Sequence, residues 1–197
     1  MTLDALRCFD RLVVGELRVA PRRIKATYRI ERGASTESCG IHYAFDEDVL
    51  DPSSELDRNL AALCAAQVAV NYGLFCDEIR FDLPLDATDL AFLREAARNT
   101  ATQIYVHKIA RENPFLVPEV AALPFEPRED YLRAVVRSEA HAPFRFGWEG
   151  RPDVCVVLSS GGKESLLTYG LLREAGVAAM PVFYNESGRH WYTALNL

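Results

Sequence analysis

The sequence lacks a long apolar run, an excess of basic residues and a leader-like N-terminus. No apolar run reaches the roughly 20 residues that a transmembrane helix needs. The N-terminus has no basic stretch followed by an apolar one, so we expect no signal peptide and a cytoplasmic protein. The formal net charge of -6 provides no strong positive field, which argues against tight, sequence-independent binding of nucleic acid.

Paired metal ligands are missing from the sequence as well. The five cysteines are scattered and form no C-x-x-C pair, and no histidines cluster near them. Structural zinc and a disulfide framework are therefore poorly supported, and we interpret the cysteines as ordinary reduced thiols. His42 falls in a predicted strand and is interpreted as structural.

Residues 1–127 have the pattern of an N-terminal α+β domain, a β-meander with helices. Two runs alternate apolar and polar residues, as strands do, and the Gly- and Ser-containing segment 31–40 between them indicates a hairpin or meander. Apolar residues at helical spacing predict one helix that begins near Ser53 or Ser54 and another capped by Asp86 or Thr88. The first helix is expected to bury Leu56, Leu60, Leu63, Val70 and Leu74. The expected strands are 24–30, 41–45 and 79–83, the expected helices are 56–74 and 86–110, and an amphipathic stretch over 3–14 precedes them all.

The segment 113–127 holds four prolines and cannot be regular structure. We interpret it as a linker or as a loop that wraps the preceding domain. A connector over 128–152 is expected to follow, with a short helix over 128–140.

Residues 153–197 change in character. Val154–Leu158 is a continuous apolar run, typical of a strand that is buried on both faces. A small-residue turn follows at 159–162, then helical spacing over 166–175 with Gly176 at its end, and then a second apolar run over 177–184. This order predicts a β-loop-α-β unit within a parallel sheet.

The turn between the predicted strand and helix is the candidate binding site of this segment. A glycine-rich turn between a strand and a helix exposes main-chain N–H groups at the positive end of the helix dipole, which is an anion site. Glycine permits positive φ and close approach of a ligand, hydroxyls donate to phosphate oxygens, and lysine adds a positive charge. A carboxylate at this place could hold a magnesium ion. The residues concerned are Ser160, Gly161, Gly162, Lys163, Glu164 and Ser165.

Three common motifs do not fit this loop. The Walker A pattern needs glycine where Val157 stands and serine or threonine where Glu164 stands. The dinucleotide pattern G-x-G-x-x-G fails because the two glycines are adjacent, and no G-x-S-x-G elbow exists in the sequence.

The segment Val156–Ser165 resembles the PP-loop of the ATP pyrophosphatase superfamily, whose pattern is S-G-G-x-D-S. This resemblance implies an adenine nucleotide alpha hydrolase-like fold, with ATP and Mg²⁺ as ligands. It also implies an activity that transfers AMP to a small substrate and releases pyrophosphate. Glu164 replaces the usual aspartate, which moves the carboxylate that would face the metal. Because a full domain of this kind has further strands and helices, we expect 153–197 to be its N-terminal part and the chain to be truncated.

Two families within the superfamily compete. The order of a β-meander, helices and then a PP-loop is similar to that of the MurL-type epimerases, which act on the terminal glutamate of UDP-N-acetylmuramoyl-L-alanyl-L-glutamate. The segment 184–190 instead resembles 7-cyano-7-deazaguanine synthases and places Asn185 and Arg189 as candidate nucleotide-binding residues. Another PP-loop ligase or thiolase, another phosphate site and a non-catalytic interaction module stay open, as does homo-oligomerisation. No catalytic acid or base is identified.

Overall fold

This computed structural model describes residues 3–139 and 153–183. They form two compact units, Met1–Phe146 and Gly147–Leu197. The protein is a mixed α/β structure, and no helix of the described residues is long and apolar enough to cross a membrane.

The N-terminal unit is built on a five-stranded mixed sheet with the order β3-β2-β1-β4-β5. Strands β1, β2 and β3 form an antiparallel meander, while β4 and β5 run parallel to β1. The strands are β1 (Arg11–Ala20), β2 (Arg23–Arg32), β3 (Ser35–Ala44), β4 (Glu78–Phe81) and β5 (Val135–Ser138). The predicted meander is therefore confirmed, although most of segment 31–40 is strand and only the turn at Gly33, with a φ of 56°, separates β2 from β3.

The central strand β1 was not predicted. We expected an amphipathic stretch over 3–14, but a short 3-10 helix, η1 (Leu3–Leu6), precedes this ten-residue strand. The strand escapes detection because a bulge between Gly15 and Arg18 shifts its pairing with β2 and breaks the alternation that marks a strand. Glu16 takes a φ of 51° there.

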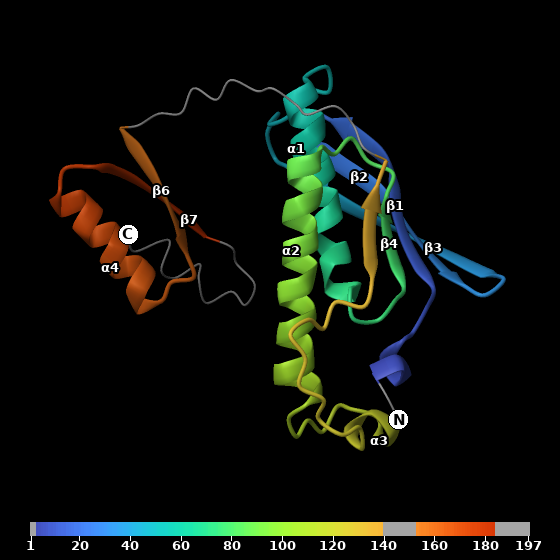
Figure 1. Ribbon diagram of the computed structural model, residues 1–197. Helices are drawn as coiled ribbons and strands as arrows, with labels where there is room; N and C mark the ends of the chain where they lie inside the picture. Colours follow the sequence, from blue (N-terminus) through green and yellow to red (C-terminus); the bar gives the residue numbers. More distant parts are fainter. Residues whose placement is uncertain (1–2, 140–152, 184–197) are drawn as a thin grey trace. The chain divides into compact units, whose positions relative to one another are not determined.

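Helices α1 (Glu55–Ala66) and α2 (Ala87–Ile104) lie on one face of the sheet (Figure 1). Each begins at a predicted cap: Ser54 accepts a hydrogen bond from the Asp57 N–H, and Asp86 forms a capping box with Asp89. The expected leucine face of the first helix is wrong at Leu60, which is exposed. Val70 and Leu74 are buried as expected, and Leu63 packs partly buried against the core. The small residues of α1 are fully buried as well, namely Ala61, Ala62, Ala65 and Ala66, followed by Ala69 in the 3-10 helix η2 (Gln67–Tyr72).

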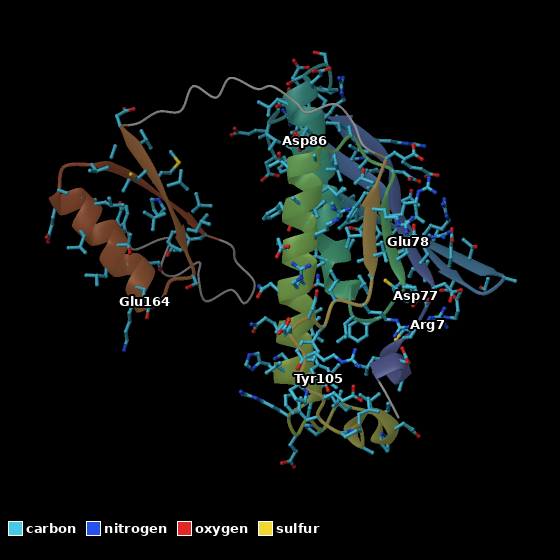
Figure 2. All side chains as sticks on the ribbon, viewed as in Figure 1. Arg7, Asp77, Glu78, Asp86, Tyr105 and Glu164 are labelled. Atoms are coloured by element: carbon cyan, nitrogen blue, oxygen red, sulfur yellow. The ribbon has the colours of Figure 1, made fainter. Side chains whose placement is uncertain are left out.

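The proline-rich segment 113–127 wraps the C-terminal end of α2. A π-helical turn, η3 (Tyr105–Ile109), ends that helix, and α3 (Pro118–Ala121) lies within the segment. Tyr105, labelled in Figure 2, stacks on Tyr131 with ring centroids 4.4 Å apart, and its hydroxyl accepts a hydrogen bond from the Glu126 N–H. Of the two interpretations of 113–127, the wrapping loop is therefore the one observed. The expectation that the segment holds no regular structure is wrong at α3, where Pro118 stands at the first helical position and costs no hydrogen bond.

The helix expected over 128–140 is wrong. Val135–Ser138 is strand β5, which pairs with β4 and buries Val136 in the core. Four residues are too few to separate strand from helix by periodicity, and the pairing with a distant strand decides the matter. The N-terminal unit accordingly extends past residue 127 into the region that we expected to be a connector.

The C-terminal unit has the predicted β-loop-α-β order, with β6 (Val154–Ser159), α4 (Lys163–Glu174) and β7 (Ala178–Phe183). The two strands are parallel, and Gly176 follows the helix with a φ of 76°. The expectation that β6 is buried on both faces is wrong. Val157 is buried, but Val156 and Leu158 on the opposite face are 60% and 80% exposed.

Candidate functional site

The candidate site is the turn between β6 and α4. Ser159 ends β6 and pairs with Phe183 at the end of β7, so the carboxyl ends of both strands lie at one edge of this sheet. Gly161 has a φ of 74°, a conformation that L side chains rarely adopt. A side chain at Gly162 would meet the Ser160 hydroxyl at 3.3 Å. The sequence thus places glycine where the backbone turns sharply and leaves little room for a side chain.

The helix amides after the turn are open to a ligand. Gly162 is the N-cap of α4, and no side chain of the described residues caps the helix. The hydrogen bond that opens the helix runs from the Leu166 N–H to the carbonyl of the N-cap residue, Gly162, at 3.2 Å. The N–H groups of Lys163, Glu164 and Ser165 therefore precede the helical hydrogen-bond ladder, at the positive end of the helix dipole.

The hydroxyls of Ser159 and Ser165 stabilise the turn through hydrogen bonds within it. The Gly161 N–H donates to the Ser159 hydroxyl at 3.2 Å, and the two hydroxyls of Ser159 and Ser165 lie 3.0 Å apart. The Ser165 hydroxyl donates to the Gly162 carbonyl at 3.1 Å, so the proton between the two hydroxyls belongs to Ser159. The amide of Gly161 and the hydroxyl of Ser165, both expected to face phosphate, are thus used within the loop.

Ser159 was not predicted as a functional residue. Its side chain is buried and forms the link between the turn and the first turn of the helix. The available signal is its position, because it directly follows the apolar run and stands two residues before Gly161.

Lys163 and Glu164 are exposed and project from the first turn of α4, where Figure 2 labels Glu164. Among residues 3–139 and 153–183, no three histidine, cysteine or acidic side chains gather closely enough to hold a metal ion. A magnesium ion at Glu164 would accordingly take its remaining ligands from phosphate oxygens and water, which is common for Mg²⁺. Asn185 and Arg189, the remaining predicted site residues, lie outside the described residues.

The densest charged cluster of the N-terminal unit is a structural network. Asp77 accepts a hydrogen bond from Arg7 at 2.7 Å and one from Arg133 at 2.9 Å, while Arg11 bridges Glu31 and Glu78 (Figure 2 labels Arg7, Asp77 and Glu78). The hydrogen bond from Arg7 and the one from Arg133 lower the pKa of Asp77. Because these carboxylates are already paired, the cluster ties the starts of β1, β4 and β5 together, and its described residues offer no unpaired carboxylate for chemistry.

Comparison of the sequence with known proteins assigns the chain to no family. No family model matches the chain, and a search of curated proteins gives no match.

Proposed function

We propose that the C-terminal unit binds the phosphates of ATP and that the protein belongs to the PP-loop enzymes. The observation that carries this proposal is the open first turn of α4, which follows a parallel strand and a turn with a positive-φ glycine. Main-chain amides in this arrangement bind phosphate groups in many unrelated proteins. The sequence around them, Ser160–Ser165, supports ATP in particular.

The residues present fit a triphosphate. The Lys163 and Glu164 amides and the Lys163 ammonium supply donors for phosphate oxygens. Glu164 supplies the one carboxylate of the loop for Mg²⁺. Ser160 is exposed beside Gly162 and has no internal partner among the described residues, so its hydroxyl is available to the ligand.

The proposed reaction is transfer of AMP to an oxygen of a small substrate, with release of pyrophosphate. A MurL-like epimerase of a terminal glutamate is the preferred version, because the order of meander, helices and loop supports it. An ionised carboxylate resists loss of its α-proton, and masking its charge with AMP would acidify that proton. Chemistry like that of 7-cyano-7-deazaguanine synthases is the alternative enzyme. An enzyme that consumes ATP works where ATP is supplied, so the proposal places the protein in the cytoplasm.

One observation favours a non-catalytic interaction module as a second candidate. The face of the two-stranded sheet opposite the buried Val157 presents large apolar side chains to solvent, and such exposed patches commonly mark contact surfaces. They are Val156, Leu158, Met180 and Val182.

Equilibrium dialysis of the full chain against labelled ATP with magnesium tests the proposal. We expect saturable binding that Lys163→Ala weakens about tenfold or more, because a hydrogen bond to a charged group contributes roughly 1.5–3 kcal/mol. Arg173→Ala is the matched control, since Arg173 lies at the far end of the same helix and contacts the Tyr169 ring. Absence of ATP binding by a folded chain, or equal weakening by both variants, would refute the proposal and favour the interaction module.

Activity is tested separately by exchange of labelled pyrophosphate into ATP in the presence of candidate carboxylates. The epimerase version predicts exchange only with a peptide that ends in L-glutamate. Exchange with a 7-carboxy-7-deazaguanine substrate would favour the alternative enzyme.

A further inference from the structure

The open face of the N-terminal sheet carries a row of basic side chains across three strands. Arg18 on β1 lies opposite Lys25 on β2, and Lys25 lies opposite His42 on β3. Residues directly opposite each other in an antiparallel pair have Cβ atoms about 5 Å apart. The neighbours of this row, Leu17 and Ile41, pack against the core, so the three basic side chains point to the face that α1 and α2 do not cover.

No carboxylate pairs with this row. Among the described residues, neither Arg18 nor Lys25 makes an ion pair, whereas Arg11, Arg29 and Arg80 on the same face each pair with a carboxylate. Like charges that face each other across strands destabilise a sheet. The row therefore costs stability in the free protein, and an anion bound to it would offset that cost.

A hollow opens beside the row. It has a volume of about 340 Å³, and its lining includes Arg18, Lys25, Thr27, Gly40 and His42. Gly40 lies opposite Thr27 on β3, and the lack of a side chain at this glycine leaves the floor of the hollow low. The hollow is at the small end of the range that ligand pockets occupy.

The β1 bulge shapes the other wall. Glu16 holds a left-handed backbone conformation that is unfavourable for a residue with a side chain. Its carboxylate accepts a hydrogen bond from the Thr27 hydroxyl at 2.8 Å and lies too far from Arg18 and Lys25 to pair with them. Strain of this kind gathers at ligand sites. Glu16 also lines the hollow, but its carboxylate is bound by Thr27 and forms no ion pair with Arg18 or Lys25 among the described residues.

We propose that Arg18, Lys25 and His42 form a binding site for the phosphate group of a small phosphate ester. A guanidinium fork, an ammonium and an imidazole together supply more donors than a single carboxylate can accept, and arginine and lysine are the usual ligands of phosphate. The row holds no phenylalanine, tyrosine or tryptophan, the large rings on which bases usually stack, which argues against single-stranded nucleic acid. This site is separate from the ATP loop and does not depend on it.

NMR titration of the full chain with inorganic phosphate tests the proposal. The experiment uses a Lys163→Ala background so that the loop does not compete, and His42→Gln identifies the imidazole signal of His42. We expect that signal to move saturably with phosphate at low salt. Arg18→Gln and Lys25→Gln should each weaken binding about fivefold, since an exposed ion pair contributes up to about 1 kcal/mol.

Two variants control for structure. Arg29→Gln removes a cation on the same face that is already paired with Glu31, and it should leave phosphate affinity within about twofold. Lys25→Arg keeps the charge and should retain binding. An unmoved His42 signal, or equal affinities for Lys25→Gln and Arg29→Gln, would overturn the proposal. Tighter binding of succinate or of a single-stranded oligonucleotide than of phosphate would also overturn it.

Discussion

Asn59 is the buried polar residue whose loss should be felt most in the N-terminal unit. Its side chain is 6% exposed, and its amide donates to the Pro84 carbonyl at 3.1 Å and to the Asp89 carboxylate at 2.7 Å. Asp89 in turn accepts from the Asp86 N–H at 2.9 Å as part of the capping box of α2. Asn59 therefore joins the middle of α1 to the start of α2.

Asn59→Ala should destabilise the unit by about 3 kcal/mol. A hydrogen bond to a neutral carbonyl contributes roughly 1 kcal/mol, and one to a charged carboxylate contributes roughly 1.5–3 kcal/mol. Asn71→Ala is the matched control, because the Asn71 amide donates to the Val68 carbonyl within its own turn and is exposed. Exposed substitutions of this kind change the free energy of unfolding by about 0.5 kcal/mol or less.

Urea unfolding followed by far-ultraviolet circular dichroism provides the measurement. With a slope of about 1–3 kcal/mol per molar urea, the Asn59→Ala midpoint should fall by about 1–3 M, while the Asn71→Ala midpoint stays close to that of the wild type. Combining Asn59→Ala with Asp89→Ala should cost less than the sum of the two single changes, because both remove the same bond. Equal midpoints for the two asparagine variants would refute the assignment of Asn59 as a buried link.

Three further predictions concern the glycines, one thiol and one carboxylate. Gly161→Ala should destabilise the C-terminal unit by about 1–2 kcal/mol because its φ is positive, whereas Gly170→Ala within α4 should stabilise it by up to about 1 kcal/mol, as thermal unfolding monitored by tryptophan fluorescence would show. Burial raises the pKa of Cys76 to about 12, so iodoacetamide should label the exposed Cys39 and spare Cys76 until urea is added, as mass spectrometry would show. The lowered pKa of Asp77 stabilises the fold above about pH 4 and loses this effect as the pH falls further, so Asp77→Asn should be less stable at pH 7 and lose less stability on acidification.

Local signals predicted the C-terminal unit well. The strand, turn, helix and second strand follow each other within 30 residues, and each leaves its own mark in the sequence: an apolar run, paired glycines, helical spacing and Gly176. The burial of β6 could not be predicted from such local signals. An apolar run indicates that a strand can be covered on both faces, but coverage depends on elements far along the chain.

The misreadings in the N-terminal unit have physical causes that act over long distances. Periodicity favoured leucine on the buried face of α1, yet the sheet accepts alanine there because the helix lies close to it. The short strand β5 takes its conformation from pairing with β4, more than 50 residues earlier in the chain. Propensity over four residues is too weak to overcome such pairing.

The two proposed anion sites differ in how a sequence can reveal them. The loop binds through main-chain amides and neighbours in sequence, so a six-residue pattern is enough to predict it. The basic row is assembled by strand register, since Lys25 stands 7 residues from Arg18 and 17 from His42. His42 by itself gave no reason to expect a ligand. A one-residue slip in the pairing of β2 with β3 would turn His42 away from Lys25, because successive side chains of a strand point to opposite faces. The β1 bulge is therefore part of the site, because the extra residue shifts the register after Gly15 and places Arg18 opposite Lys25.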